Sequence, residues 1–319
     1  MSVRLIRSLL SGHERFAVTG ASGWLGRTTL ELLAGALGPQ QFRDQVVGFA
    51  STSRTVTLRA GTEVRLQPLH RLAELAPAPT HLLHFAYLTR NRVPEVGVPE
   101  YVTANLAITA AVISAIQRFR PSGVFTTSSG AVYGPDGYFV TDVAANPYGA
   151  LKYLEELAVR CAAADAGTRS VVTRVFSLSG AYMTKPELYG LGDFLLQVLA
   201  GGPITVRATR PVERSYCAAA DVVTLALACL LRGDGQEDLV FDTGGDVIEV
   251  GQLADRVIGA LGLTEVSVER SWDPQAPPDR YVGDGTAMSA LALTYGLPLL
   301  AIDGQIRETA AYLRDHSEL

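Results

Sequence analysis

The chain has 319 residues, 48% of them hydrophobic, which suffices for a sizeable core in one large two-lobed domain or in two ordinary domains. Its 27 basic and 32 acidic residues give a net charge of -5 without a strongly basic patch. This balance does not indicate a nucleic-acid or anionic-membrane surface, and it favours a small soluble ligand.

The cysteine pattern fits a reducing, cytoplasmic compartment. Cys161, Cys217 and Cys229 are an odd number and include no Cys-x-x-Cys pair, which argues against a disulfide framework and a zinc site. The N-terminal segment is interrupted by arginines, and no long uncharged apolar stretch follows, so we expect neither an export signal nor a membrane segment. Metal-ligand spacing is also absent among the histidines His70, His81, His84 and His316, and we expect no metal.

Short apolar runs alternate with longer helical patterns along the first half of the chain. The expected strands lie at 15–20, 46–51, 81–87, 123–129 and 170–176, and the expected helices at 28–37, 101–119 and 148–166. Strands that are apolar throughout, each followed by a helix, are typical of a parallel sheet with helices on both faces. We therefore predict a doubly wound α/β Rossmann domain over residues 1–176.

The alternation becomes less regular after residue 176. Helices are expected at 191–202 and 221–233, a strand at 239–245, and a loop in the proline-rich stretch 272–280. We predict a smaller, mostly substrate-binding lobe over residues 177–319, and we expect the strand near 239–245 to rejoin the Rossmann sheet.

The first strand runs into a glycine-rich turn, TGASGWLG, that opens the first helix. Gly20, Gly23 and Gly26 permit a tight turn and let backbone N–H groups approach a pyrophosphate at the helix N-terminus. The spacing alone also fits an ordinary glycine turn, but its place on the first strand-to-helix connection favours a dinucleotide site.

The end of the second strand bears on the choice of cofactor. An acidic residue there would bind the adenosine ribose diol of NAD, but the strand runs instead into Ser51, Thr52, Ser53 and Arg54. Arg54 with neighbouring hydroxyls suits a 2'-phosphate, so NADP is favoured slightly over NAD. Alternatively, Arg54 is a solvated loop residue.

The stretch NPYGALK carries the candidate proton-transfer group. Asn146 suits a helix N-cap and Pro147 the first helical position, so that Tyr148 and Lys152 fall four residues apart on one helix face. A nearby ammonium and the helix N-terminus are expected to favour the Tyr148 phenolate, which would exchange a proton with a hydroxyl or ketone. Alone, this spacing is also common by chance on exposed helices.

The strand at 123–129 ends in hydroxyl residues. Ligands of parallel sheets bind outside the carboxyl ends of the strands, so Ser128 and Ser129 are expected in the same crevice as the glycine turn. Ser129 would donate a hydrogen bond to the reacting oxygen, although a turn-forming serine is the simpler interpretation of this residue alone.

Together, TGASGWLG, SSGAVYG and YGALK resemble the extended short-chain dehydrogenase/reductases, the NAD-dependent epimerase/dehydratase family, over nearly the whole chain. The resemblance implies Ser129, Tyr148 and Lys152 as the catalytic triad, with Lys152 also holding the nicotinamide ribose. The implied cofactor contacts are Gly20, Gly23, Trp24, Leu25, Gly26, Phe85, Ala86, Tyr87, Asn105, Thr127, Tyr148, Lys152 and Val175. It also implies a homodimer through the helices at 101–119 and 148–166.

The second half resembles the same family in the segments 199–223, 281–291 and 302–315. The implied substrate contacts are Ser128, Ser129, Ser177, Arg214 and, as a weaker phosphate candidate, Arg280. Arg214 is also explicable as a surface arginine in a salt bridge.

The resemblance narrows the chemistry. Sugar dehydratases of the family typically carry an Asp-Glu pair, and the decarboxylases a glutamate, in the loop where this chain has Gly130 and Ala131. We therefore expect redox chemistry at a carbinol centre of a nucleotide-linked sugar, with epimerisation and net reduction both open. The alternatives are an NADPH-dependent ketone or aldehyde reductase and a catalytically idle NAD(P)-binding protein.

Overall fold

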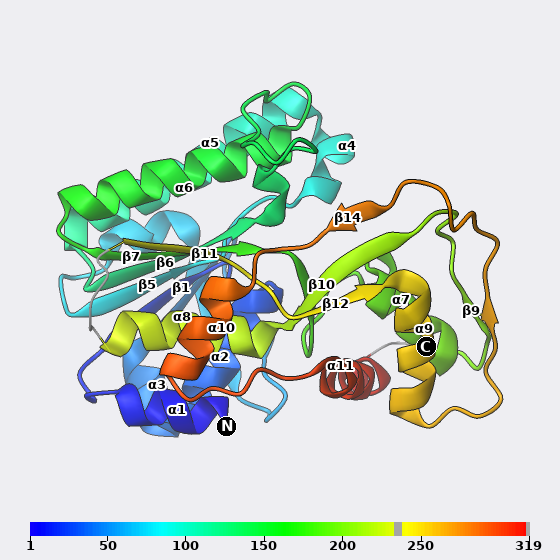
Figure 1. Ribbon diagram of the computed structural model, residues 1–319. Coiled ribbons are helices and arrows are strands. Elements are labelled where there is room, and N and C mark those ends of the chain that lie inside the picture. Colours follow the sequence, from blue (N-terminus) through cyan, green and yellow to red (C-terminus); the bar gives the residue numbers. More distant parts are fainter. Residues whose placement is uncertain (233–237, 317–319) are drawn as a thin grey trace. The chain divides into compact units, whose positions relative to one another are not determined.

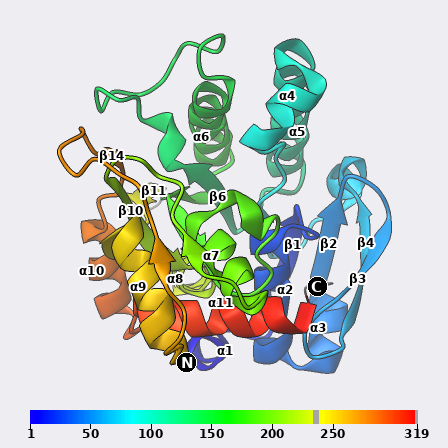
Figure 2. The same cartoon turned by 90° about the vertical axis from the view of Figure 1, so that its right-hand side faces the viewer.

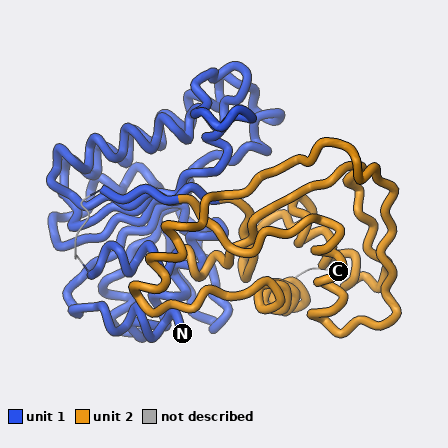
Figure 3. Tube along the Cα trace, viewed as in Figure 1, with its two compact units in different colours: residues 1–175, 223–241 blue, residues 176–222, 242–319 orange. Residues whose placement is uncertain are grey.

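A computed structural model describes residues 1–232 and 238–316 of the chain. It contains two compact units, Met1–Val175 with Val223–Phe241 and Phe176–Val222 with Asp242–Leu319 (Figure 3). The first unit thus includes most of helix α8 (Ala219–Arg232) and of strand β11 (Asp238–Asp242), which lie in the second half of the chain. The helix expected at 221–233 ends within the described residues at Arg232, and Gly233 lies outside them.

The first unit is built on an eight-stranded sheet in the order β11-β7-β6-β5-β1-β2-β4-β3. Neighbours from β7 to β4 pair in parallel, and β3 pairs antiparallel with β4. The strands are β1 (Arg15–Thr19), β2 (Val46–Ala50), β3 (Arg54–Thr57), β4 (Glu63–Pro68), β5 (Thr80–His84), β6 (Gly123–Ser129), β7 (Arg169–Val175) and β11 (Asp238–Asp242). The predicted Rossmann-type α/β fold is confirmed.

Helices cover both faces of this sheet (Figure 1). The helical segments are α1 (Ser2–Leu9), α2 (Trp24–Leu37), α3 (Pro39–Gln45), η1 (Leu69–Glu74), η2 (Arg90–Arg92), α4 (Val93–Val96), α5 (Val98–Phe119), η3 (Gly130–Val132), α6 (Pro147–Asp165) and α8 (Ala219–Arg232). Figures 1 and 2 show α5 and α6 side by side over one face, with α1, α2 and α3 on the other. The central strands β1, β2, β5 and β6 are buried at nearly all positions because helices cover both faces of the sheet there, whereas the edge strand β3 is exposed.

Among the described residues, α5 is the one helix long and apolar enough to cross a membrane by composition. Its buried positions include Tyr101, Thr109, Val112 and Ile116, which share one face of the helix. Val112 and Ile116 belong to the core cluster formed with strands of the sheet and with α6. The apolar composition of α5 is therefore that of a core helix.

The sheet reverses its strand order at β1, which lies between β5 and β2. In open parallel sheets the ligand crevice lies at this reversal, outside the carboxyl ends of the strands. Thr19 ends β1 and His84 ends β5, and the two residues are paired in the β1–β5 register. The elements that carry the candidate site start from these two strand ends and from the end of β6.

The second unit contains smaller sheets and five further helices within the described residues. One sheet has the order β12-β10-β14, with β8 also paired to β10, and another pairs β13 with β9. Its elements are β8 (Ser177–Ser179), η4 (Pro186–Leu188), α7 (Gly190–Leu199), β9 (Ile204–Thr205), β10 (Val212–Ala218), β12 (Asp246–Glu249), α9 (Val250–Leu261), β13 (Val268–Glu269), β14 (Asp279–Tyr281), α10 (Thr286–Thr294) and α11 (Ile302–His316), together with the start of α8.

Candidate functional site

The glycine turn between β1 and α2 is shaped by close backbone contacts. Gly20 has φ +63°, and a Cβ there would lie 2.6 Å from the backbone nitrogen of Ala86. A Cβ on Gly26 would overlap the carbonyl oxygen of Gly20. Both positions therefore require glycine. Gly23 is the N-cap of α2 and no side chain caps this helix, so its first N–H groups suit a pyrophosphate.

Residues beside this turn complete one wall of the candidate cofactor site. Trp24 and Leu25 open α2 and are half-buried. Ser51, Ser53 and Arg54 lie exposed where β2 ends and β3 begins, and Arg54 Nη2 donates to the Thr52 hydroxyl at 3.1 Å. This corner therefore offers a cation and hydroxyls, and no carboxylate occurs among residues 51–54.

The loop after β5 is held by Asn105 of α5. Its Oδ1 accepts a hydrogen bond from the Leu88 N–H at 2.9 Å, and its Nδ2 donates to the Tyr101 carbonyl at 3.1 Å. Asn105 is 1% exposed and holds the loop that follows Phe85, Ala86 and Tyr87. The Tyr87 hydroxyl is buried without a hydrogen-bond partner in the described residues, as a group meant for a ligand would be.

The end of β6 and the start of α6 bring the three predicted catalytic residues together. Asn146 caps α6 as expected, accepting a hydrogen bond from the Gly149 N–H at 3.0 Å. The Ser129 side chain hydrogen-bonds to the Tyr148 hydroxyl, and its Oγ also accepts from the Ala131 N–H. The neighbouring Ser128 hydroxyl is buried and has no partner in the described residues. Val175 lies opposite Ser129 in the β6–β7 register.

The electrostatics of Tyr148 differ from the sequence-based expectation. Burial raises the pKa of its phenol, the hydrogen bond with Ser129 lowers it, the charge of Glu155 raises it and Arg90 lowers it, for a net rise. The net shift is thus opposite to the lowering expected from Lys152 and the helix N-terminus, because burial and the charge of Glu155 outweigh the hydrogen bond with Ser129 and the charge of Arg90.

Lys152 is buried and its ammonium is fully engaged. Nζ donates to the Thr127 carbonyl at 2.9 Å and to Glu155 Oε2 at 2.8 Å, and it lies 3.7 Å from the centre of the Tyr87 ring. Tyr87 packs edge-on against Tyr148, with ring centres 6.0 Å apart. Lys152 is thus fixed beside the tyrosine pair by a carbonyl, a carboxylate and an aromatic face.

Two further residues of this site were not predicted from the sequence. Glu155 Oε1 lies 3.1 Å from His84 Nε2, and His84 Nδ1 lies 2.7 Å from the Thr19 hydroxyl. His84 lies at the buried end of β5 and links the ends of β1 and β5 to α6. The sequence does contain a signal for the Glu155–Lys152 ion pair: residues three apart in a helix are neighbours on its surface, and Glu155 follows Lys152 by three.

The second unit contains the predicted substrate-binding residues Ser177, Arg214 and Arg280. Ser177 is half-buried in β8, opposite Tyr216 of β10. Arg214 Nη1 donates to the carbonyls of Glu213 and Asp279, both at 2.9 Å, and its Nη2 lies 3.2 Å from Asp279 Oδ2.

The two arginines lie on opposite faces of their sheet. In the parallel β10–β14 register Arg214 pairs with Tyr281, whereas Arg280 pairs with Glu213. Side chains of successive residues in a strand point to opposite faces, so one ligand on one face meets only one of the two. Arg280 is exposed and forms an ion pair with Glu213.

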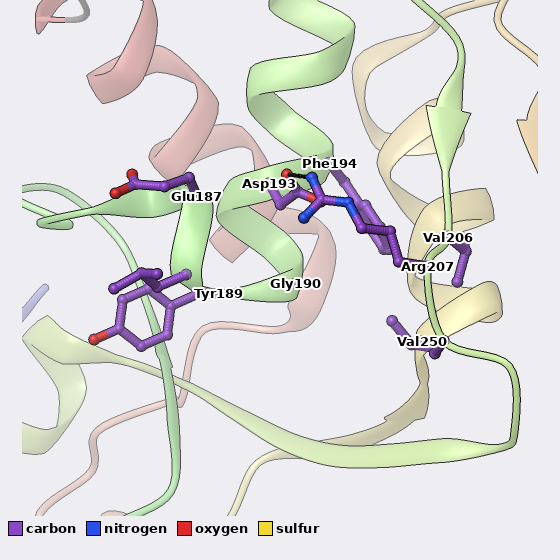
Figure 4. A pocket seen from close by; sticks show the side chains of 10 residues that line it. Glu187, Tyr189, Gly190, Asp193, Phe194, Val206, Arg207 and Val250 are labelled. Carbon is purple, nitrogen blue, oxygen red and sulfur yellow. Dashed lines mark hydrogen bonds and ion pairs between the residues drawn. The ribbon is translucent and has the colours of Figure 1, made fainter. Parts of the chain in front are cut away.

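A pocket that the sequence did not reveal also lies in this unit (Figure 4). Its wall combines the buried ring of Phe194 with apolar side chains, and the Asp193–Arg207 ion pair, with a 2.9 Å N–O distance, lies at its side. The lining residues are Glu187, Leu188, Tyr189, Gly190, Asp193, Phe194, Val206, Arg207, Ala208 and Val250.

No group of three or more potential metal ligands occurs among residues 1–232 and 238–316. Burial lowers the pKa of His81 in β5 to about 4, and its ring stacks on that of Phe16 with ring centres 5.6 Å apart.

Comparisons with known proteins identify related sequences. A UDP-glucose 4-epimerase of Azospirillum brasilense is 30% identical over 302 residues, covering 83% of each chain. A UDP-glucose 4-epimerase of Mycoplasma genitalium is 27% identical over 236 residues, covering 64% of this chain and 69% of the relative.

Solved structures show the same fold. A UDP-N-acetylglucosamine 4-epimerase of Methanobrevibacter ruminantium superposes with a TM-score of 0.74 at 16% identity, covering 96% of this chain and 99% of the other. A UDP-glucose 4-epimerase of Thermus thermophilus, solved with NAD, gives 0.70 at 20% identity, covering 95% and 100%. The family model for the NAD dependent epimerase/dehydratase family matches residues 16–247. The chain belongs to this enzyme family.

Proposed function

We propose that the protein is an NAD(P)-dependent epimerase of a UDP-linked sugar that oxidises a carbinol centre and reduces it again on the other face. The observation that carries this proposal is the grouping of Ser129, Tyr148 and Lys152 at the carboxyl edge of the same sheet that bears the glycine turn. The named relatives support the substrate class, since both are UDP-glucose 4-epimerases.

The side chains divide the work as follows. The cofactor, when bound along the glycine turn, supplies a hydride acceptor and donor. Tyr148 takes the proton from the sugar hydroxyl during oxidation and returns it to the keto oxygen during reduction. Ser129 holds the reacting oxygen beside Tyr148, and Lys152 holds the nicotinamide ribose and stabilises the phenolate. Tyr87 and Ser128 add buried hydroxyls that a ligand can satisfy.

The corner at Arg54 favours NADP within the NAD(P) site. Arg54 donates to a neighbouring hydroxyl and lies exposed at the end of β2, where a 2'-phosphate would meet it together with Ser51 and Ser53. A preference for NADP would favour a second candidate function. In this function the protein reduces a keto-sugar, or a non-sugar ketone or aldehyde, with net consumption of NADPH.

The substrate's nucleotide is assigned to the second unit. We place the diphosphate at Arg214, which is half-buried and oriented by the carbonyls of Glu213 and Asp279 and by the Asp279 carboxylate. We place the base in the pocket walled by Phe194. The Arg214 guanidinium is already paired with the Asp279 carboxylate, so a bound diphosphate must replace this carboxylate as the partner of Arg214.

The exposed face of α5 and α6 is proposed as the dimer interface. Leu106 of α5 and Leu154 and Leu157 of α6 are 42%, 46% and 44% exposed. The two helices pack against each other (Figure 2), so these exposed apolar side chains lie on adjacent elements.

Tyr148→Phe tests the proposed reaction. Loss of the proton-transfer group should lower kcat for UDP-glucose/UDP-galactose interconversion by about 10³-fold. The fold and cofactor binding should persist, because the ring of Tyr148 still packs on Tyr87. Interconversion at the wild-type rate would overturn the mechanism, and stoichiometric NADPH consumption by the wild type would establish a reductase instead.

Arg54→Ala tests the cofactor preference. The Kd for NADP should rise about tenfold, the loss of one exposed charge-assisted contact, while the Kd for NAD changes little. Calorimetry or nucleotide fluorescence measures both. Tighter binding of NAD by the wild type, with no effect of Arg54→Ala on either cofactor, would exclude the preference for NADP.

Arg214→Ala tests the diphosphate site, with Arg280→Ala as its matched control on the opposite sheet face. The Kd for UDP should rise about 10–100-fold for Arg214→Ala and stay near the wild-type value for Arg280→Ala. If UDP binding depends on Arg280 instead, the assigned face is wrong.

Leu154→Glu with Leu157→Glu tests the dimer. Two charges in an apolar interface should dissociate it, so light scattering should give twice the single-chain mass for the wild type and the single-chain mass for the variant. A monomeric wild type contradicts the proposal.

A further inference from the structure

The buried carboxylate of Glu155 is not used by the proton transfer described above. Glu155 lies on α6 and is 1% exposed, which is rare for a glutamate unless it is paired. Its two oxygens serve different partners, Lys152 Nζ at 2.8 Å and His84 Nε2 at 3.1 Å. Its neighbour Glu156 is buried too, but it binds Arg174 on the end of β7. Adjacent glutamates on one helix therefore hold two different cations.

Hydrogen-bond accounting assigns the direction of each bond in the Glu155 chain. The Thr19 hydroxyl oxygen accepts from the N–H groups of Phe85 and Ala86, both at 3.3 Å, so its own proton is free to donate to His84 Nδ1. The tautomer of His84 that follows carries its proton on Nε2 and donates it to Glu155. Glu155 is thus an acceptor from both sides, as an ionised carboxylate is.

The charge of Glu155 is consistent with this assignment. Burial acts to raise the pKa of its carboxyl, but the charge of the Lys152 ammonium and the hydrogen bonds from His84 and Lys152 bring this pKa below the usual range. An anion and a cation are therefore locked together three residues apart on α6.

Three groups surround the ammonium of Lys152. Nζ donates to the Thr127 carbonyl and to Glu155, and it lies over the face of the Tyr87 ring. The groups that face Tyr148 from the surrounding elements are Glu155 and Lys152 on α6, Tyr87 after β5, Arg90 in η2, Tyr101 on α5 and Ser129 at the end of β6.

We propose that Glu155 is a positioning residue for the reaction: its carboxylate fixes the ammonium of Lys152 in place beside Tyr87, which packs against Tyr148. His84 and Thr19 orient the carboxylate from the strand end that leads into the glycine turn. The proposal deepens the proposed function and rests on it, because it assumes that Tyr148 transfers the proton.

Glu155→Gln and Glu155→Asp separate charge from reach. Glu155→Gln removes the negative charge, so the rising limb of log kcat against pH should move to lower pH, with kcat falling about tenfold as Lys152 loses its fixed position. Glu155→Asp keeps the charge but shortens the reach, so kcat should fall while the limb stays near its wild-type pH. Glu156→Gln is the matched control, since it removes a buried charge one residue away without touching Lys152, and it should leave the limb in place.

A second measurement needs no turnover. Lys152 and Lys185 are the chain's two lysines, so isotope-labelled lysine in a Lys185→Arg background gives a single ammonium signal in heteronuclear NMR. This signal should be slow to exchange with water in the wild type and in Glu156→Gln, and it should be lost in Glu155→Gln. If no UDP-sugar is converted, the proposed function fails, but this spectrum still decides whether Glu155 holds Lys152. The proposal would be overturned if the Lys152 ammonium signal of Glu155→Gln matched that of the wild type. It would also be overturned if an active Glu155→Gln enzyme kept the rising limb of log kcat at the wild-type pH.

Discussion

A buried charged group is costly unless it is paired and hydrogen-bonded, and the ammonium of Lys152 is buried. Much of the candidate site in the first unit is arranged around the partners of this ammonium. The carbonyl at the end of β6 supplies one acceptor, Glu155 supplies another, and the ring of Tyr87 supplies an electron-rich face. Each partner comes from a different element, so fixing the ammonium also fixes α6 against the strand ends. The tyrosine one turn earlier on α6 is thereby placed beside Ser129.

The parts of the fold with a strong local signal were predictable from the sequence. Apolar strands followed by long helices identified the parallel sheet, and the cap and proline before Tyr148 marked the start of α6. Gly20 and Gly26 were predictable for a physical reason, since the chain approaches itself too closely at both positions for any side chain. The grouping of Ser129 with Tyr148 followed from the rule that strand ends of a parallel sheet share one edge.

The features that escaped prediction depend on contacts between distant segments. Thr19, His84 and Glu155 lie far apart in the chain, and no spacing announces a hydrogen-bonded path through all three. The raised pKa of Tyr148 escaped for the same reason, because burial and the charge of Glu155 outweigh the hydrogen bond with Ser129 and the charge of Arg90. The pocket at Phe194 and the opposite orientations of Arg214 and Arg280 required the packing and the strand register of the second unit.

The central claim is that a hydride passes from a sugar carbon to the bound cofactor and returns to the other face of the same carbon. Tyr148 takes the proton of the sugar hydroxyl during oxidation and returns it during reduction. The most direct measurement uses UDP-glucose deuterated at C4, incubated with the protein in ordinary water and analysed by NMR and mass spectrometry. The account predicts UDP-galactose that keeps its deuterium at C4, with no net change in the cofactor. Epimer that has exchanged the label with water, or no epimer from any UDP-sugar supplied, would contradict it.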